Sequence, residues 1–367
     1  MDFTPTEAQT DLAQLTGEVC AKLVTADRLR ELDTDARFDE QLWKALAETG
    51  VLAAALPEEL GGSDFGMQEQ ASILRELGRS VAAVPYLWSV VVGAGALARF
   101  GDDAQRALAG RAGTGEVVLS AALAEQNHAA TDAPGIVAAA AGTGWALTGS
   151  ATTVAFADRA ERILVPASVS GQTAVFLVDP SDASVTRTAQ QVVDLGPEFG
   201  VEFASTPAEL IGTLDTGAEI LTWLREHAWL GLAALQLGTL ERALELTAEH
   251  ARTREQFGKP VGAFQSVAQR LADAYIDVQG LRLTVTQAAW RVAENLPAAE
   301  SIHIAKFWAA DAGHRVAHTV IHIHGGIGID RDHIVHNYFT AAKHHEFALG
   351  GATPHLLALG AELAEGA

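Results

Sequence analysis

Cysteine and basic residues are scarce in this chain of 367 residues. Because Cys20 is the only cysteine, no internal disulfide can form, which favours a reducing, cytoplasmic compartment. Lys and Arg number 25 against 46 Asp and Glu, so the formal net charge is −21. Such a surface repels a phosphate backbone and an anionic membrane, so neither nucleic acid nor a membrane is an expected partner. A polyanionic cofactor would have to be held by a few well-placed Arg, Lys and backbone N–H groups.

Long uncharged runs are also scarce. The one long example, residues 80–98, is rich in alanine and contains Pro85, Gly93 and Gly95. It predicts a buried helix, because a membrane span needs about 20 strongly apolar residues. The N-terminus has neither a basic region nor an apolar run, so no signal peptide is expected. Apolar residues make up 49% of the chain, which is enough for a large core and excludes wholesale disorder.

Hydrophobic patterning divides the chain into three regions, within the two to three domains that its length suggests. Residues 1–112 carry apolar residues at helical spacing. Residues 113–215 carry short β-type runs separated by turn residues, which predict an antiparallel sheet or small barrel. Residues 216–367 return to helices, with a clean amphipathic stripe between Phe264 and Leu281. The expected fold is α+β, with an N-terminal helical domain, a central antiparallel β domain and a C-terminal helical bundle.

Cations gather at one predicted helix end, in residues 251–260. Arg252, Arg254 and Lys259 lie close to Gly258 in an otherwise acidic chain. Arginine beside a backbone turn can hold a pyrophosphate through bidentate, charge-assisted bonds. Cations also suit the dipole at any helix C-terminus, and spacing alone favours this simpler interpretation.

Glycine and histidine mark a second stretch, residues 322–328. Its glycines would let a ligand approach the backbone, but it follows a helix and so does not fit a βαβ dinucleotide fingerprint. Ten of the thirteen histidines fall between His303 and His355. His314, His318 and His322 could share one helix face, yet no His-Glu-x-x-His string or cysteine pair supports them, so no metal site is expected.

Taken together, these motifs resemble those of the acyl-CoA dehydrogenase family. Arg254-x-x-Phe257-Gly258-Lys259 is followed by Gln265 and later by Gly325-Gly326-x-Gly328, while residues 57–62 and 75–79 resemble the family's N-terminal helical domain. The resemblance covers nearly the whole chain. It implies an N-terminal α bundle, a central β domain and a C-terminal four-helix bundle. The implied reaction is α,β-dehydrogenation of an acyl-CoA, in which a carboxylate removes the α-proton and FAD accepts the β-hydride at a subunit interface.

The resemblance also assigns cofactor-binding residues. Arg254 would pair with the FAD pyrophosphate, Phe257 would pack on the cofactor and Gln265 would bond its adenosine half. The glycine-rich stretch would approach the pyrophosphate through His322, which replaces a common Gln, and through Gly325 and Gly326.

The catalytic base is where this sequence departs from the family. The two positions that usually carry the glutamate hold Leu349 and Ala228, so no catalytic residue is assigned. The nearest carboxylates are Glu346 and Glu226, and Glu226 lies roughly 200° around the helix from Ala228. An apolar side chain cannot accept a proton, and a positioned base contributes about 10²–10⁴-fold.

The central domain departs as well. Residues 123–127 replace the usual Thr-Glu-Pro loop, and residues 153–156 replace the usual flavin-contacting Trp-Ile-Thr. The chain thus keeps the half-site that it would lend to a neighbour and lacks the half-site that it would use itself. Residues 324–330 and 349–355 resemble the base-less subunit of actinobacterial heterotetrameric (α2β2) steroid side-chain acyl-CoA dehydrogenases.

That branch implies a homologous catalytic partner subunit, a sterol-derived acyl-CoA substrate and, by family analogy, an electron-transfer flavoprotein as acceptor. Two alternatives stay open. The chain could be a self-sufficient homo-oligomeric dehydrogenase that uses Glu226 or Glu346 as an unconventional base. It could also be a flavin-free scaffold subunit.

Overall fold

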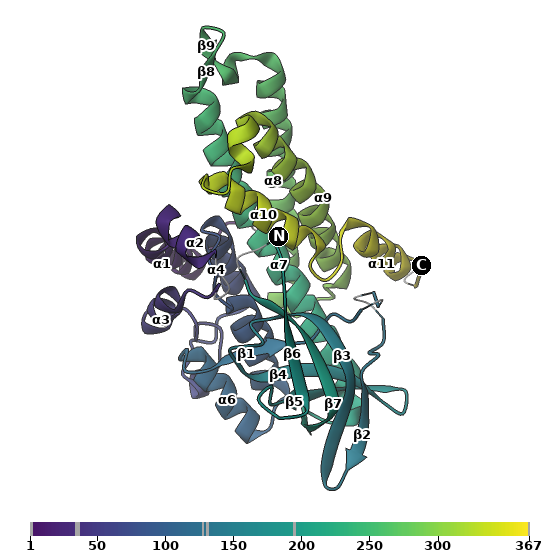
Figure 1. Cartoon of the computed structure of the whole chain (residues 1–367). Coiled ribbons are helices and arrows are strands. Elements are labelled where there is room, and N and C mark those ends of the chain that lie inside the picture. The colour runs from purple at the N-terminus through teal and green to yellow at the C-terminus, as the bar shows by residue number, and fades with distance from the viewer. Residues whose placement is uncertain (1–2, 34–36, 127, 130–131, 194–195, 366–367) are drawn as a thin grey trace.

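A computed structural model describes residues 3–33, 37–126, 128–129, 132–193 and 196–365 of the chain. Helices come first, a β sheet follows, and longer helices complete the molecule (Figure 1). This order confirms the predicted α+β fold. Among the described residues, no helix is both long enough and apolar enough to cross a membrane.

The N-terminal part consists of short helices. They are α1 (Glu7–Leu23), α2 (Ala26–Leu32), α3 (Glu40–Glu48), η1 (Glu58–Leu60), α4 (Met67–Arg79), η2 (Tyr86–Ala94), α5 (Gly95–Phe100) and α6 (Asp103–Gly113). Side chains of Thr6, Thr25, Asp39 and Asp102 cap helix N-termini, which explains where these helices begin. The uncharged run forms η2 and α5 and is almost entirely buried, as its composition predicts.

The sheet closes on itself. Its strands are β1 (Val118–Ala121), β2 (Val137–Ala141), β3 (Gly144–Ala155), β4 (Ala160–Val169), β5 (Gln172–Val178), β6 (Val185–Gln190) and β7 (Glu198–Leu210). Pairing runs β2–β3–β7–β5–β4, and one β2–β4 residue pair completes the ring. The β1–β4 and β2–β4 pairings are parallel and the other described pairs are antiparallel. The sheet is thus mainly antiparallel and closes as a small barrel, as predicted, with parallel pairing only where the ring closes and where β1 joins it.

The C-terminal part is built around one long helix, α7 (Gly217–Thr253). The other elements are η3 (Leu214–Thr216), β8 (Glu255–Gln256), β9 (Lys259–Pro260), η4 (Val261–Ala263), α8 (Gln265–Ala293), α9 (Ala299–His324), η5 (Gly325–Ile329), α10 (Ile334–Phe347) and α11 (Ala352–Glu365). Glycines allow α7 to cross α4 very closely: a Cβ on Gly238 would lie 1.8 Å from the Arg75 carbonyl oxygen, and one on Gly78 would lie 2.1 Å from that of Leu235. No larger residue fits either position.

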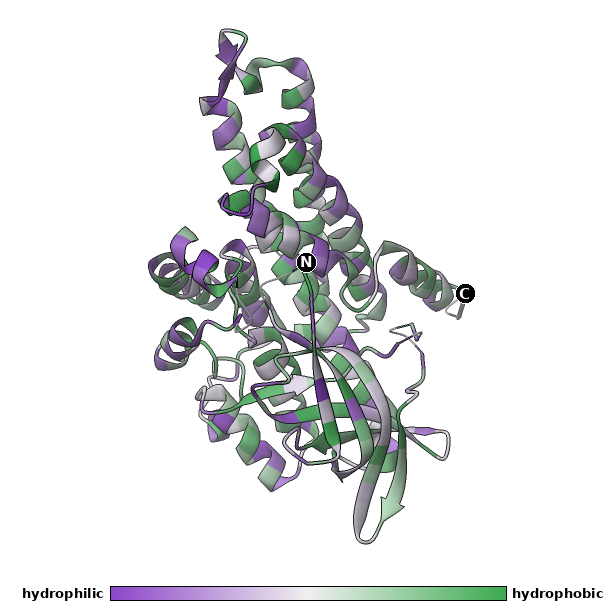
Figure 2. Ribbon diagram, in the orientation of Figure 1, coloured by the Kyte–Doolittle hydropathy of each residue, from purple (hydrophilic) through white to green (hydrophobic). Residues whose placement is uncertain are grey.

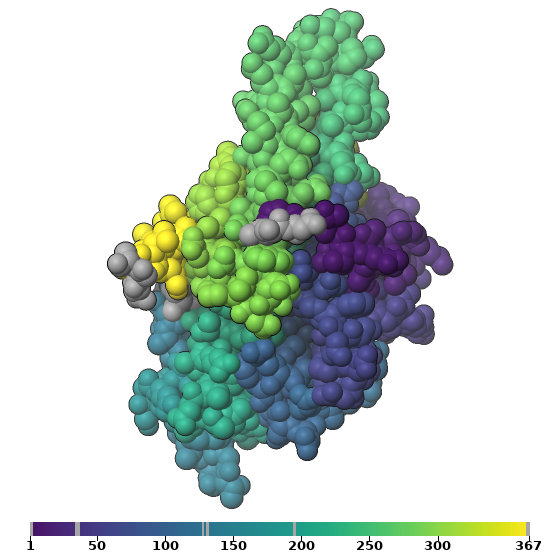
Figure 3. Space-filling view, turned by 180° about the vertical axis from the view of Figure 1, so that it is seen from behind, coloured from purple at the N-terminus to yellow at the C-terminus, as the bar shows by residue number. Residues whose placement is uncertain are grey.

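The far end of α7 and the start of α8 project from the body of the molecule (Figures 1 and 3). The predicted stripe on α8 is buried at Ala274, Val278 and Leu281 but only half-buried nearer the tip. Tyr275 and Ile276 are more than half exposed on the same helix. Figure 2 shows hydrophobic residues along these projecting helices. The chain alone therefore does not cover the apolar surface at this end.

A buried carboxylate ties three helices together. Glu241 on α7 is 4% exposed and forms ion pairs with Arg75 at 2.7 Å and Arg79 at 3.2 Å, both on α4, and with Arg282 on α8 at 2.7 Å. A buried ion is tolerated only when it is paired, and removing its partner leaves uncompensated charge. Glu241 thus links the N-terminal helices to the C-terminal bundle.

We expect Glu241→Ala to lower the free energy of unfolding by about 3 kcal/mol, the lower end of the range for breaking a buried pair, because the arginines keep some contact with water. The matched control is Glu245→Ala on the same helix. Glu245 pairs with Arg79 and Arg242 but is 46% exposed, so its loss should cost about 1 kcal/mol or less. Urea unfolding of the two variants measures both values. If both variants lost the same free energy of unfolding, Glu241 would not be the residue that ties the three helices together.

Candidate functional site

The cationic helix end forms an exposed hairpin. Arg254 caps α7, and β8 pairs with β9 through the two-residue turn Phe257-Gly258. Both turn residues have positive φ, 53° and 76°, as type I′ hairpin turns require. Glycine adopts this conformation freely, whereas Phe257 is held there under strain. The Phe257 ring therefore lies at the tip of the hairpin.

At this tip, the side chains either are exposed or contact one another. Phe257 is 92% exposed, and its ring centroid lies 6.2 Å from that of Phe264. The Lys259 ammonium sits 4.3 Å from the centroid of the Phe264 ring. Arg252 pairs with Glu249, but across the described part of the chain no carboxylate lies within ion-pair distance of Arg254. The tip therefore offers a free guanidinium beside an exposed aromatic ring.

The glycine-rich stretch lies at the same end of the bundle. His324, the last residue of α9, stacks on His250 in the last turn of α7 with ring centroids 4.3 Å apart. His322, Gly325 and Gly326 are exposed, and a Cβ on either glycine would meet nothing within 4 Å. Gln265 is exposed at the start of α8. The structure thus gathers all six sequence-predicted cofactor residues at one end of the C-terminal bundle.

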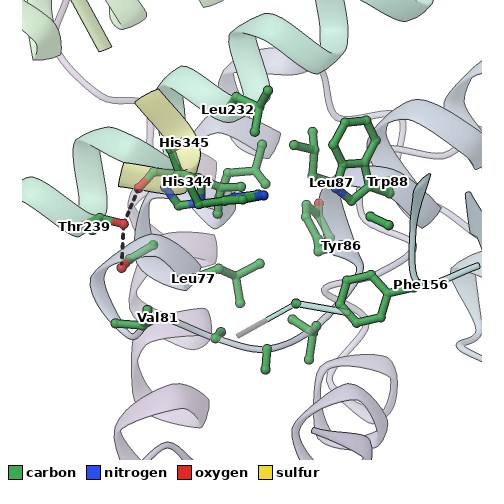
Figure 4. A pocket seen from close by; sticks show the side chains of 18 of the residues that line it. Leu77, Val81, Tyr86, Leu87, Trp88, Phe156, Leu232, Thr239, His344 and His345 are labelled. Carbon is green, nitrogen blue, oxygen red and sulfur yellow. Dashed lines mark hydrogen bonds between the residues drawn. The ribbon is translucent and has the colours of Figure 1, made fainter. Parts of the chain in front are cut away.

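That end is far from the chain's own sheet. Leu232, midway along α7, lines a chamber beside the sheet (Figure 4), and the helix rises by about 33 Å along its axis between Leu232 and its C-cap Arg254. A side chain cannot bridge such a gap. The six residues therefore cannot act at a site in the sheet of the same molecule.

A cavity of about 540 Å³ lies where the sheet meets the end of α10. Its walls are largely apolar and include Trp88, Val192, Val193, Phe347, Ala348 and Leu349. Ala124 and Thr153, from the two segments that depart from the family pattern, also line it, whereas Asn127 of the first segment lies outside the described residues. Such a volume and lining are typical of a small-molecule site.

The two usual base positions offer no proton acceptor. Leu349 lines the cavity with φ 51°, and Ala228 is fully buried within α7. Glu346 is buried and does not line the cavity; its carboxylate contacts Lys343 Nζ at 2.5 Å and His314 Nδ1 at 3.1 Å, and Lys343 is itself a lining residue. Glu226 lines a different cavity, between the N-terminal helices and the end of α8, where burial and Glu362 raise its pKa. Neither alternative base is positioned beside Leu349.

The one carboxylate on the wall of the Leu349 cavity is Glu198, within the described residues. Glu198 opens β7, is 6% exposed, and accepts a 2.6 Å bond from His344 Nε2 of α10. Sequence reasoning missed this pair, because nothing in either local motif signals a contact between residues so far apart in the chain.

Buried polar groups hold the loop that carries Leu349. Lys306, fully buried on α9, donates to the carbonyl oxygens of His345 at 3.1 Å and Gly350 at 2.8 Å. The Leu349 carbonyl accepts bonds from Trp229 Nε1 at 3.1 Å and His355 Nε2 at 3.2 Å. Burial lowers the pKa of His355 to about 3, so its ring is neutral, and its Nδ1 accepts the 2.9 Å bond that His303 donates. Sequence patterns did not reveal this clamp.

The sequence predicts no metal site, and the structure shows where the three histidines that could share one helix face lie. The rings of His314 and His318 on α9 lie 4.5 Å apart in a tilted arrangement, and His314 contacts Glu346, whereas His322 is exposed. Within the described ranges, no group of three or more His, Cys, Asp or Glu is arranged to hold a metal ion.

The fold is that of the acyl-CoA dehydrogenases. Butyryl-CoA dehydrogenase from Megasphaera elsdenii shares it at a TM-score of 0.90 with 24% identity, over 99% of this chain and 100% of that one. Family models of the acyl-CoA dehydrogenase N-terminal and C-terminal domains match residues 6–109 and 215–363. The chain belongs to the acyl-CoA dehydrogenase family.

Several relatives of this chain are more similar to it in sequence than butyryl-CoA dehydrogenase is. Acyl-CoA dehydrogenase FadE27 of Mycobacterium tuberculosis is 48% identical over 100% of this chain and 99% of its own. One chain of the ChsE4–ChsE5 complex of M. tuberculosis superposes with a TM-score of 0.94 at 49% identity, covering 100% of this chain and 99% of that one. A chain from a variant of the Tcur3481–Tcur3483 steroid acyl-CoA dehydrogenase does so at 0.93 and 35%, over 98% of each chain.

The buried lysine gives the protein a pH dependence that can be measured. Burial lowers the pKa of Lys306 to about 7, against about 10.5 in the unfolded chain. Between these values the unfolded state binds more protons, so the free energy of unfolding rises with pH. From pH 7 to pH 9 the wild type should gain about 2 kcal/mol relative to Lys306→Met.

Urea unfolding at pH 7, 8 and 9 measures this difference. Lys44→Met serves as the control, because Lys44 is 76% exposed and its loss should leave the wild-type rise intact. A Lys306→Met protein with an unchanged rise would show that another group causes it.

Proposed function

We propose that this chain is the base-less subunit of a heteromeric FAD-dependent acyl-CoA dehydrogenase. Its helical tip binds FAD carried mainly by a homologous partner subunit, and the partner supplies the catalytic glutamate. The observation that carries the proposal is the Arg254 guanidinium at an exposed tip, which has no carboxylate partner among the described residues, in a chain whose own cavity has Leu349 where a base is needed. In this arrangement residues 1–112, 113–215 and 216–367 act as the three domains.

The tip suits FAD by its chemistry. A guanidinium without a carboxylate partner can bind a pyrophosphate through two parallel bonds. The exposed Phe257 ring offers an apolar face to an aromatic ligand. Open space over Gly325 and Gly326 lets a phosphate approach the backbone, with His322 and Gln265 as further polar contacts. When bound, FAD supplies the acceptor for the substrate's β-hydride.

The role of this chain is then binding and orientation. Arg254 and His322 would fix the cofactor from across the subunit interface, and the apolar faces of Phe257 and of projecting α8 would exclude water there. Leu349 and Ala228 cannot take up the α-proton, so that step falls to the partner. The base of the partner subunit must then face the substrate in the partner's own cavity.

The relatives support an assembly of two homologous chains. The ChsE4–ChsE5 complex and the Tcur3481–Tcur3483 enzyme each contain two different proteins, and the second is a steroid acyl-CoA dehydrogenase. We therefore propose an α2β2 assembly acting on a steroid side-chain acyl-CoA, with an electron-transfer flavoprotein as the electron acceptor.

Purification with and without the homologous partner tests the proposal. The isolated chain should show little flavin absorbance and no acyl-CoA oxidation, whereas the co-expressed complex should be yellow and active. The partner to co-express is a homologous acyl-CoA dehydrogenase subunit that carries the family's catalytic glutamate. Turnover by the isolated chain would refute the base-less role.

Two pairs of variants of the complex separate the alternatives. Arg254→Ala should lower the FAD content of the complex several-fold, while the matched Arg252→Ala, whose guanidinium is already paired with Glu249, should retain it. Unchanged FAD in the Arg254→Ala complex would favour a flavin-free scaffold. Glu226→Gln and Glu346→Gln should leave turnover within about twofold, since neither residue lines the Leu349 cavity. A loss of a hundredfold or more would identify an unconventional base.

A further inference from the structure

A further cavity, of about 680 Å³, lies at the end of the C-terminal bundle opposite to the Arg254 tip. Its walls come from the start of α7, the end of α8, α5 and the first turn of α4. Among the described residues, it shares no lining residue with the tip or with the Leu349 cavity. A ligand held here would therefore occupy neither the proposed cofactor site nor the Leu349 cavity.

Aromatic rings order one wall of this cavity. The Arg99 guanidinium carbon lies 5.2 Å from the centroid of the Phe100 ring, which meets the Trp223 ring edge-on with centroids 6.0 Å apart. Trp223 in turn stacks on His227, with centroids 3.7 Å apart and an interplanar angle of 22°. Arg99, Trp223 and His227 all line the cavity. Because these side chains already support one another, a ligand would spend little free energy on ordering them.

Two buried polar side chains on the cavity wall lack partners. Burial lowers the pKa of His227 to about 4, so its ring is neutral; Nδ1–H donates to the Trp223 carbonyl oxygen at 2.9 Å and Nε2 is left as an acceptor. Gln70 on α4 is 9% exposed, as is His227. Within the described ranges, neither His227 Nε2 nor the Gln70 side-chain amide makes a hydrogen bond. Buried polar groups are nearly always bonded, so these two point to a ligand in the cavity.

Two opposite charges on the same wall are also unpaired. Arg99 and Glu226 both line the cavity, and neither forms an ion pair with any residue that the structure describes. Burial and the nearby Glu362 raise the pKa of Glu226, so its ionised form would be stabilised by a cation at this place. The Arg99 guanidinium suits a carboxylate, which it can bind through two parallel bonds. The cavity therefore matches a ligand that carries one charge of each sign.

The rest of the lining is largely apolar. Leu56, Met67, Val91 and Leu296 contribute aliphatic or thioether side chains, and Trp223 contributes an aromatic ring. Apolar walls with a few convergent polar groups, in a volume of this size, are typical of a small-molecule site. The part of the ligand that joins or extends from its two charges should accordingly be apolar and bulky.

We propose that this cavity binds a zwitterionic α-amino acid with a large apolar side chain. Arg99 pairs with the ligand carboxylate, to which the Gln70 amide donates a further bond. Glu226 pairs with the ligand ammonium, and His227 Nε2 accepts one of its N–H bonds. The ligand side chain packs against Trp223 and the aliphatic wall. This site does not depend on the proposed function, because it uses neither the flavin contacts nor the Leu349 cavity.

Isothermal titration of the purified full chain with three probes of nearly the same shape tests the proposal. L-phenylalanine carries both charges, L-phenylalaninamide only the ammonium, and hydrocinnamate only the carboxylate. L-phenylalanine should bind at one site per chain. Each of the other two probes should bind about tenfold more weakly, because each lacks one charge-assisted contact.

Two variants assign the two contacts. Arg99→Gln should weaken L-phenylalanine about tenfold and remove its advantage over L-phenylalaninamide, while its advantage over hydrocinnamate remains. Glu226→Gln should do the reverse and remove only the advantage over hydrocinnamate. Such crossed losses identify which charge each residue binds, and a variant that merely disturbed the fold would weaken all three probes alike.

The matched control is Arg30→Gln, an exposed arginine that pairs with Asp27 on α2 and does not line the cavity. It should bind all three probes as the wild type does. The proposal is overturned if L-phenylalanine shows no saturable binding up to about 10 mM, some tenfold above a millimolar dissociation constant. It is equally overturned if the wild type binds the three probes with the same affinity, or if Arg99→Gln and Glu226→Gln leave the L-phenylalanine affinity unchanged.

Discussion

The length of one helix fixes how far the Arg254 tip of this molecule lies from its own sheet. Helix α7 is 37 residues long, or about 55 Å, and it runs from the sheet through the crossing with α4 to the projecting tip. The crossing requires Gly78 and Gly238, and Glu241 locks it to the arginines of α4 and α8. Because α7 is rigid, Arg254 and the chain's own sheet are held at a fixed and large separation. In the proposed assembly, the Arg254 tip therefore serves a flavin site on another molecule and not one at the sheet of its own.

The same rigidity gives the cavity beside the sheet its character. Lys306, His355 and Trp229 fix the loop that carries Leu349 from three sides, so no carboxylate on that loop can swing into place. Glu346 is instead engaged with Lys343 and His314. The packing around Leu349 thus holds this loop in place and keeps the Glu346 carboxylate engaged with other side chains.

Sequence reasoning predicted the order of the fold, because helical and strand spacing are local patterns, and the six residues that it named as cofactor contacts lie at one end of the C-terminal bundle. It did not reach the Glu198–His344 pair or the Lys306 clamp, because these join positions that only tertiary packing brings together. Nor did it foresee the parallel β1–β4 pairing, since the alternation within a strand carries no information on the direction of its neighbour. The amphipathic stripe on α8 is present as its spacing predicts, but its burial near the tip requires a surface that this chain does not supply.

The account rests on a cofactor that bridges two subunits, with this chain contributing only from its tip. The most direct measurement is a crystal structure of the complex with its homologous partner, purified with flavin. The account predicts flavin density between the partner's sheet and Arg254 of this chain, and none against residues 153–156 of this chain. Flavin seated on residues 153–156, with Arg254 facing solvent, would contradict it.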